Sequence, residues 1–498
     1  MPLVSHPVME GAAAATFEHG RLGGDEAREW AAMQRAGAGV AQGITAELAA
    51  AGVGPATPGS ILVLAGKGHN GGDALIAAAE LAVQAPGWRF EVGLVFPVRQ
   101  LRPLAQRALR DLTQGPARER VRLVRVDDLA AAYLAVIDGV FGFQYRPPLR
   151  ERAVGWLRAV NQLDVRLRAA VDLPSGWDEP DAFRADVTLA TGIVKTPLLT
   201  LANGGRRRYV DIGFFDGAEP GEVRVLAPAA VLAPLRKLRP AGSDKRTFGH
   251  LFLVGGSRSY PGAIAMSVAA ALRSGVGLVT AFVPESVAAA YAARWPEAMW
   301  VACPEAPDGG LSIDTGTLVR ERWSRASALV MGPGLGREAE TLAMVKTLVQ
   351  DARVPVVLDA DALQPDIVAA GSASRVVTPH AGEFARLAGG PDAGPADFRP
   401  GPPTVLVLKG PVTQIWQEGR SHHAFCAGPV LARGGSGDLL AGLIGGRLAA
   451  HPEDPAGAAA EGVVWHGLAA DRLARHEGEI AVRTTALLDH LAPVLREE

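Results

Sequence analysis

The chain has little cysteine, little lysine and no long apolar run. Its two cysteines, Cys303 and Cys426, lie too far apart in sequence to form a metal cluster by themselves, and they are typical of buried thiols in a reducing compartment. The richest apolar stretch, Ala263 to Leu272, is shorter than the roughly 18 residues that a membrane-spanning helix needs. The N-terminus lacks a basic segment followed by an apolar one, so we expect no secretory signal and a cytoplasmic protein.

An excess of charge of one sign is also missing, because 52 acidic residues nearly balance 50 basic ones. A chain without a strong net field is expected to have neither a nucleic-acid partner nor a membrane partner. Only six of the basic residues are lysine, and most of these, Lys67 and Lys409 among them, fall inside glycine-rich or phosphate-binding-like motifs. The position of these lysines indicates that the motifs are functional.

The length of 498 residues exceeds one ordinary core, and about 150 residues per domain predicts two or three units. Both halves alternate short apolar runs with longer alanine-rich amphipathic stretches, the pattern of parallel sheets covered by helices. A proline- and glycine-containing segment from about residue 216 to 244 indicates a linker. We therefore predict two α/β domains, residues 1–220 and 221–498, with residues 1–25 forming a loosely docked arm.

The apolar runs predict strands whose ends carry polar chemistry. In the first half the predicted strands are Ile61–Ala65, Phe90–Phe96, Val121–Val126, Leu134–Asp138, Leu167–Leu173, Val187–Ala190 and Tyr209–Ile212. In the second half they are His250–Val254, Leu278–Val283, Ala328–Met331, Val354–Asp359, Arg375–Thr378, Thr404–Lys409 and Thr413–Gln417. Several of them end in glycine, aspartate or Thr-Pro, at the edge where open α/β sheets bind ligands.

The first glycine-rich loop, Gly66 to Asp73, joins a predicted strand to a predicted helix. Glycines allow the backbone to approach a ligand closely, and the new helix offers free amides to an anion such as a phosphate. An ordinary dinucleotide site also needs an acidic residue after the second strand, and residues 96–99 supply none, which disfavours a dehydrogenase. The alternative is a tight turn with Asp73 as a helix cap.

Two further polar clusters follow predicted strands, Asp138-Gly139 and Asp172-Leu173-Pro174-Ser175. Each aspartate alone would more often be a cap or a turn former. Together with Asn70, their oxygens are suited to surround a hard cation, or one carboxylate is suited to act as an acid or base.

In the second half, glycines or acidic residues follow the predicted strands at six places. The last motif, Gly434 to Asp438, is the most informative about the reaction. Consecutive glycine amides at a helix start form an anion-binding nest. An aspartate at the end of such a nest can take a proton from an attacking hydroxyl during phosphoryl transfer. A capping aspartate is the alternative, but six such strand ends in one domain favour a shared nucleotide site.

The first half resembles the NAD(P)H-hydrate epimerase family over roughly residues 25 to 215, through the Lys67–Asp73 loop, the Asp138 strand, the Val171–Ser175 motif and Ala185–Thr188 followed by Lys195. The resemblance implies a Rossmann-like three-layer domain in which Asp172 is the catalytic acid or base. It implies a potassium site at Asn70, Asp138 and Ser175. The residues it implies as contacts of the hydrated cofactor are His69, Asn70, Gly71, Gly72, Asp73, Gly142 and, as a compensating group, Arg146. Two departures are His69, where the family usually has asparagine, and the loop from Gly142 to Tyr145.

The second half resembles ribokinase-like proteins, and among them the ADP/ATP-dependent NAD(P)H-hydrate dehydratases, over roughly residues 230 to 490. The matching segments are Lys245–Gly249, Val254–Ala263, Gly332–Gly336, Val357–Leu363, Val377–Glu383 and Gly434–Leu440. This resemblance implies a ribokinase-like α/β domain with Asp438 as catalytic base and Glu383 assisting magnesium. The implied contacts of the hydrate are Ala263, Gly336, His380 and Asp438. The implied contacts of the adenine nucleotide are Lys409, Gly410, Pro411, Val412, Thr413 and Gly437.

Together the resemblances imply a bifunctional cofactor-repair enzyme. The first domain would interconvert the R and S epimers of hydrated NADH or NADPH. The second would dehydrate the S epimer to NAD(P)H while ADP, or ATP, is consumed, with ADP giving AMP and phosphate. Magnesium and potassium ions are the implied metals, a small-molecule substrate is the implied partner, and association into a homo-oligomer is expected by analogy.

Two other functions remain open at this stage. A kinase of a small hydroxylated metabolite would use the same second-half motifs, but it would accumulate a phosphorylated product instead of releasing phosphate. Alternatively, the first half would be a nucleotide-sensing or protein-binding module without catalysis, a reading that the presence of Asp172 disfavours.

Overall fold

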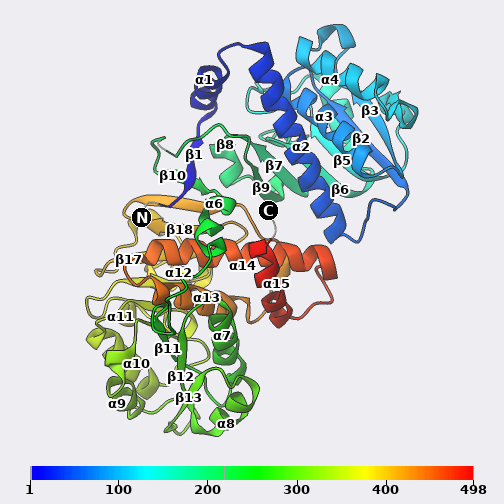
Figure 1. Ribbon diagram of the computed structural model, residues 1–498. Helices are drawn as coiled ribbons and strands as arrows, with labels where there is room; N and C mark the ends of the chain where they lie inside the picture. Colours follow the sequence, from blue (N-terminus) through cyan, green and yellow to red (C-terminus); the bar gives the residue numbers. More distant parts are fainter. Residues whose placement is uncertain (1–2, 218, 497–498) are drawn as a thin grey trace. The chain divides into compact units, whose positions relative to one another are not determined.

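The computed structural model describes residues 3–217 and 219–496, which fold into two compact units (Figure 1). The N-terminal unit comprises His6–Gly221 and a short return of the chain, Ala474–Glu479. The C-terminal unit comprises the described parts of residues 1–5, 222–473 and 480–498. Each unit is an α/β fold, and the predicted α/β class is confirmed. In the described residues, no helix combines the length and the apolar character needed to cross a membrane.

The N-terminal unit is built on one parallel sheet in the strand order β4-β3-β2-β5-β6-β7-β9. Its strands are β2 (Gly59–Ala65), β3 (Trp88–Leu94), β4 (Val121–Val124), β5 (Ala132–Gly139), β6 (Asp164–Val171), β7 (Val187–Thr191) and β9 (Arg206–Val210). The first strand of the series, β2, lies in the middle, and the chain adds strands first on one side of it and then on the other. Ligands bind such sheets where the strand order reverses, here between β2 and β5.

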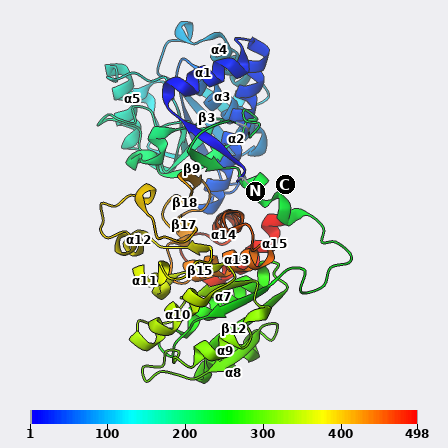
Figure 2. The same ribbon diagram turned by 90° about the vertical axis from the view of Figure 1, so that its left-hand side faces the viewer.

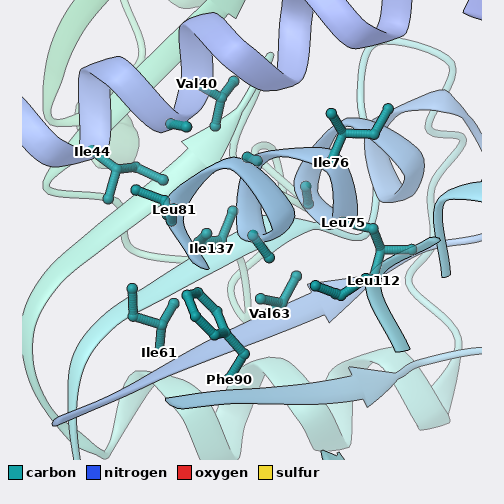
Figure 3. Close-up of a cluster of buried hydrophobic side chains, with 14 of the residues drawn as sticks. Val40, Ile44, Ile61, Val63, Leu75, Ile76, Leu81, Phe90, Leu112 and Ile137 are labelled. Carbon is teal, nitrogen blue, oxygen red and sulfur yellow. The ribbon is translucent and has the colours of Figure 1, made fainter. Parts of the chain in front are cut away.

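Helices cover both faces of this sheet because the side chains of a strand alternate between faces. In β2, Ile61 and Val63 pack under α2 (Glu26–Ala50), α3 (His69–Gln84) and α4 (Pro103–Gln114), whereas Leu62 and Leu64 pack against α5 (Glu151–Asn161). Figure 3 shows the first of these layers, with Phe90 and Ile137 beneath α3. Figure 2 shows α5 on the other side of the sheet from α2. The predicted three layers are therefore present.

Residues 3–25, the described part of the N-terminal arm, are ordered and packed, so the prediction of a loosely docked segment was wrong. Strand β1 (Ser5–Met9) pairs in parallel with β8 (Val194–Lys195), Met9 opposite Lys195. Helix α1 (Gly11–Leu22) follows and buries Ala14 and Leu22. The arm is held by a partner strand almost 190 residues away and by packing of small side chains. Its own sequence therefore shows only weak hydrophobic periodicity.

The C-terminal unit has a mostly parallel sheet in the order β13-β12-β11-β14-β15-β16-β17-β18-β19-β10, with antiparallel pairing on both sides of β18. Its strands are β10 (Val223–Leu226), β11 (His250–Val254), β12 (Leu278–Pro284), β13 (Met299–Cys303), β14 (Ala328–Met331), β15 (Val356–Leu358), β16 (Arg375–Val377), β17 (Thr404–Leu408), β18 (Thr413–Gln417) and β19 (Arg420–Ala424). The order reverses between β11 and β14, so the expected ligand edge is where these two strands end.

Helices again lie on both faces of the sheet, and most of them are visible in Figure 1. They are α6 (Pro228–Leu232), α7 (Pro261–Arg273), α8 (Glu285–Arg294), α9 (Thr315–Arg320), α10 (Ala339–Asp351), α11 (Pro365–Val368), α12 (Ala381–Leu387), α13 (Ser436–Ala450), α14 (Pro455–Glu477) and α15 (Leu487–Arg496). Helices α7 and α13 pack closely because α13 carries glycines at the contact. A Cβ atom on Gly442 would stand 2.1 Å from the Ser267 carbonyl oxygen. This close approach fixes the start of α13, which carries Asp438.

The sequence did not predict strands β1, β8, β10, β13 and β19. The predicted linker contains β10 and α6, and β10 pairs with β19, some 200 residues away. The sequence of strand β19 is Arg-Ser-His-His-Ala. Most of its buried side chains are polar, so no apolar run indicates a strand there. Cys303 and Cys426 are both buried thiols, as expected.

Candidate active sites

The glycine-rich loop of the N-terminal unit is shaped by close backbone packing at the switch between β2 and β5. A Cβ atom on Gly66 would stand 1.9 Å from the Val140 carbonyl oxygen, and one on Gly71 would stand 2.2 Å from the Gly66 carbonyl oxygen. A Cβ atom on Gly72 would meet the Met33 side chain at 2.1 Å. Gly71 and Gly72, which we predicted as substrate contacts, are therefore buried beneath the site, where they allow α3 to start close to the sheet.

A cavity of about 650 Å³ opens above these strand ends. Its polar lining residues are Glu18, Glu29, Lys67, His69, Asn70, Asp73, Arg102, Gln144, Tyr145, Arg146, Asp172, Thr191 and Lys195. A volume of this size is within the usual range for a ligand site. Of the predicted cofactor contacts, His69, Asn70, Asp73, Gly142 and Arg146 line the cavity together with Asp172.

Asp172 lies directly after β6 in a left-handed backbone conformation, with φ of 68°. Its Oδ1 accepts a hydrogen bond from Lys195 Nζ, and its Oδ2 accepts one from the Phe143 amide at 3.3 Å. The side chains of Asp172 and Lys195 are both almost fully buried. Left-handed backbone at a non-glycine residue is costly and is concentrated at functional sites. This buried ion pair is therefore a strong candidate for acid-base chemistry.

Asp138, Ser175 and Asn70 form a second buried group beside the cavity. The Ser175 hydroxyl donates to Asp138 Oδ1 at 2.7 Å, and the Ser175 amide donates to Oδ2 at 2.7 Å. Burial raises the pKa of Asp138 to about 6, even though these hydrogen bonds lower it. Asn70 Nδ2 donates to the Val171 carbonyl at 2.9 Å. No basic side chain among residues 3–217 and 219–496 forms an ion pair with Asp138.

Two more carboxyl groups of the cavity have raised pKa values. Burial, together with the Glu18 and Asp172 carboxylates, raises the pKa of Asp73 well above its ordinary value, and Asp73 Oδ1 has no hydrogen-bond partner in the described chain. Burial also raises the pKa of Glu18, with partial opposition from Lys195 and His69. Several carboxyl groups with raised pKa values in one cavity are a sign of acid-base function.

In the C-terminal unit, the predicted strand ends converge on one region. A Cβ atom on Gly332, whose φ is 130°, would stand 1.7 Å from the Asp359 carbonyl oxygen, so the ends of β14 and β15 touch through backbone. The Ser267 hydroxyl donates to the carbonyl oxygen of Asp438 at 2.8 Å and lies 3.3 Å from that of Ala263. Gly336 donates its amide to Asp361 Oδ2 at 3.1 Å. The structure thus brings Ala263 close to Asp438.

Asp438 lies in the first turn of α13, after the N-cap Gly435 with φ of 90°. Burial raises the pKa of Asp438 to about 6, with a further rise from the Asp359 carboxylate and a reduction from Lys409. The amides of Gly434, Gly435 and Gly437 donate no hydrogen bond to any group of the described chain. Free amides at a helix start offer an anion site beside this carboxyl group.

Lys409 lies at the centre of an ionic cluster next to Asp438. Its Nζ donates to Asp359 Oδ1 at 2.9 Å and lies 4.0 Å from Glu383 Oε2. Burial lowers the pKa of Lys409, but the two carboxylates raise it by more, so the net shift is upward. A Cβ atom on Gly437 would stand 3.1 Å from this Nζ. Lys409, Glu383 and Gly437 therefore meet at one place, as predicted for a shared site.

His380 and Glu383 form a reciprocal cap at the start of α12. His380 Nδ1 accepts from the Gly382 amide at 3.0 Å, and Glu383 Oε2 accepts from the His380 amide at 2.8 Å. His380 Nε2 and Glu383 Oε1 lie 3.5 Å from each other. The remaining predicted nucleotide contacts, Gly410 to Val412, form the turn between β17 and β18, and Thr413 begins β18.

Sequence reasoning missed two groups of the N-terminal cavity. Glu18 lies on the arm whose order was not expected, so nothing indicated that it faces the site. Lys195 was noted only as part of a family pattern, and its ion pair with Asp172 joins residues on β8 and after β6.

Comparisons with known proteins identify both units. Residues 251–493 match a family model described as NAD(P)H-hydrate dehydratase, and residues 30–197 match one described as YjeF-related protein N-terminus. A bifunctional NAD(P)H-hydrate repair enzyme of Gloeobacter violaceus is 36% identical over 93% of each chain. One from Moorella thermoacetica is 34% identical over 88% of this chain and 87% of its own. A crystal structure titled ADP/ATP-dependent NAD(P)H-hydrate dehydratase from Bacillus subtilis is 27% identical, over 54% of this chain and 96% of that one, with a TM-score of 0.45.

Proposed function

The chain belongs to the family of bifunctional NAD(P)H-hydrate repair enzymes, and from this we propose how its residues divide the two reactions. Residues 1–220 epimerise the hydrated cofactor, and residues 221–498 dehydrate its S epimer. The observation that carries the proposal is a carboxyl group at a strand or helix end in each unit, the buried Asp172 beside Lys195 and the half-buried Asp438 beside Lys409.

In the N-terminal unit, Asp172 acts at the hydrated ring carbon as acid or base. The Lys195 ammonium and the Phe143 amide hold the carboxylate at the cavity wall. His69, Asn70, Asp73, Gly142 and Arg146 contact the rest of the hydrated cofactor, since all of them line the same cavity. Gly71 and Gly72 support these contacts from below.

The oxygens of Asn70, Asp138 and Ser175 are suited to a potassium ion. Asp138 is a fully buried carboxyl group without a basic partner among the described residues, and a monovalent cation would compensate its charge. Asn70 directs its amide nitrogen to Val171, which leaves its oxygen for a cation. A bound potassium ion would supply charge compensation that keeps the Asp138 loop in place.

In the C-terminal unit, Asp438 is the base that takes the proton of the ring hydroxyl. The hydroxyl oxygen then bonds to the terminal phosphorus of the nucleotide while the bond from that phosphorus to the leaving nucleotide breaks. The resulting ester loses inorganic phosphate as the ring nitrogen donates its electron pair and the carbon–oxygen bond breaks, and loss of a ring proton then gives NAD(P)H. With ADP the other products are AMP and phosphate. The free amides of Gly434, Gly435 and Gly437 offset the charge that develops on the phosphoryl group.

Lys409 to Thr413 and Gly437 hold the adenine nucleotide, and Ala263, Gly336 and His380 contact the hydrate. Glu383 fits a magnesium role through Oε1 only, because Oε2 caps α12. Magnesium is often held by one or two protein carboxylates together with phosphate oxygens. A bound magnesium ion would offset phosphate charge, and Lys409 Nζ donates a hydrogen bond to Asp359 in the same cluster.

The proposal is tested by incubating the purified protein with mixed hydrate epimers and ADP or ATP. We expect recovery of the absorbance of reduced cofactor from both epimers, with release of inorganic phosphate. Recovery that stops at about half would contradict the epimerase assignment, because a dehydratase site is stereospecific. A stable phosphorylated product would identify a kinase instead.

The pH profile of dehydration tests the role of Asp438. Its pKa is raised to about 6, and only the ionised carboxylate can accept a proton, so kcat/KM should fall as pH drops below 6. At pH 5 about a tenth of the enzyme would be active. The Asp359→Asn variant removes a negative charge that raises this pKa, so its acid limb should move to lower pH. A flat profile between pH 4.5 and 8 would contradict the role.

Association into a homo-oligomer and a cytoplasmic location stay predictions.

A further inference from the structure

Epimerisation of a ring alcohol requires chemistry on two faces of one carbon. The hydroxyl-bearing carbon of the hydrate is next to the ring nitrogen, whose electron pair can expel the hydroxyl as water. Water must then add from the opposite face, so one group has to protonate the leaving hydroxyl and another has to deprotonate the incoming water. Asp172 can serve only one of these faces well, and the following inference rests on its proposed role.

Glu18 occupies the middle of the inward face of α1. Residues at i, i+4 and i+8 lie on one side of a helix, and Ala14, Glu18 and Leu22 have this spacing. Ala14 and Leu22 are buried against the N-terminal unit, whereas the side chain of Glu18 lines the cavity and is 24% exposed. An acidic side chain in the middle of a buried helix face lowers the stability of the fold, because its charge loses hydration. Its presence at this position therefore indicates a functional role.

The Glu18 carboxyl group has no hydrogen bond to any described group. It faces charged residues from four other segments, which are His69 and Asp73 on α3, Glu29 on α2, Asp172 after β6 and Lys195 on β8. Its nearest basic atom is His69 Nδ1 at 4.0 Å, too far for a hydrogen bond. The carboxyl group is therefore available to a bound molecule.

A purely structural role for Glu18 is poorly supported. An ion pair with His69 would hold α1 over the cavity, but His69 lies closer to Glu29, with Nε2 3.7 Å from Glu29 Oε2. Helix α1 is held instead by apolar packing, because Ala14 and Leu22 pack in one cluster with Ala32, Ile193 and Phe214. The charge of Glu18 adds nothing to that packing.

We propose that Glu18 is the second acid-base residue of the epimerase and serves the face of the ring opposite to Asp172. In one direction, the protonated Glu18 carboxyl group gives its proton to the leaving hydroxyl, the carbon–oxygen bond breaks, and the nitrogen electron pair forms a carbon–nitrogen double bond. Water then adds from the other face, and Asp172 accepts its proton. In the reverse direction the two carboxyl groups exchange roles.

The electrostatics of the two groups match these roles. Burial raises the pKa of Glu18, whereas Asp172 accepts hydrogen bonds from Lys195 Nζ and from the Phe143 amide. Two carboxyl groups in one site with different surroundings are a recurring arrangement in acid-base enzymes.

The test follows exchange of the substrate hydroxyl with ¹⁸O-labelled water in the full-length protein. Epimer ratios and label content are measured together for the wild type, Glu18→Gln, Asp172→Asn and Glu26→Gln, after subtraction of the rate without enzyme. We expect Glu18→Gln to slow epimerisation by roughly 10²- to 10⁴-fold. It should still exchange the hydroxyl of the one epimer that Asp172 serves, whereas Asp172→Asn should exchange only the other epimer.

Glu26→Gln is the matched control, because Glu26 is a glutamate of α2 that is exposed and does not line the cavity. It should epimerise within about threefold of the wild type, as expected outside catalytic groups. Dehydration of the S epimer by the same chains verifies folding. The proposal is overturned if Glu18→Gln epimerises at a near-normal rate, or if both variants lose exchange in both epimers. A wild type that neither exchanges nor epimerises would overturn the proposed epimerase itself, and this proposal with it.

Discussion

The Asp438→Asn variant should lose NAD(P)H-hydrate dehydration by roughly 10²- to 10⁴-fold in kcat, the range of a missing general base. Asparagine has the shape of aspartate but cannot accept the proton of the ring hydroxyl. The fold around it should persist, because Ser267 binds the main-chain carbonyl of Asp438 and not its side chain. The loss is measured from the initial rate at which reduced-cofactor absorbance returns, with ADP and with ATP.

Two controls separate catalysis from folding in this experiment. Epimerisation by Asp438→Asn should stay within about twofold of the wild type, since Asp172 is unaffected. Asp366→Asn replaces a surface aspartate of the same unit that pairs with Lys346, and it should dehydrate normally. If Asp438→Asn kept more than a tenth of the dehydration rate, Asp438 would not be the base.

The Asp172→Asn variant should show the opposite loss, with epimerisation reduced by roughly 10²- to 10⁴-fold and dehydration of the S epimer preserved. Asparagine tolerates the left-handed backbone that this position adopts, so the substitution should not strain the chain. It leaves the Lys195 ammonium without its carboxylate partner and removes the acid-base group. The measurement is the rate at which one purified epimer converts to the mixture in the absence of nucleotide.

Asp164→Asn is the matched control for this variant, because Asp164 begins the same strand, β6, and is exposed. It should epimerise at the rate of the wild type. Equal losses of epimerisation and dehydration in a folded Asp172→Asn protein would contradict the division of labour between the units.

Much of both sites could be predicted from the sequence because the relevant signals are local. A short apolar run followed by glycine or aspartate identifies a strand and the chemistry at its end, and this pattern located Asp138 and Asp172. Asp438 was located by the glycine run before an apolar helix. In a parallel sheet the carboxyl ends of strands share one edge, so residues far apart in sequence could be expected to meet. The meeting of Lys409 and Glu383 follows from this rule.

The parts that escaped prediction depend on long-range pairing. Glu18 faces the cavity only because β1 pairs with β8 and because α1 packs through small side chains. The ion pair of Lys195 with Asp172 could not be predicted, because it depends on the path of the chain between β7 and β8. Gly71 and Gly72 could be recognised as required for close packing only once the carbonyl of Gly66 and the side chain of Met33 were located.

The central claim is that one chain carries two independent sites, one centred on Asp172 and the other on Asp438. The most direct measurement mixes the two inactive variants with both hydrate epimers and ADP. Asp172→Asn alone should rapidly recover about half of the reduced cofactor, because its dehydratase site accepts one epimer. Asp438→Asn alone should recover almost none, and an equimolar mixture of the variants should recover all of it. A mixture that recovers no more than Asp172→Asn alone would contradict the account.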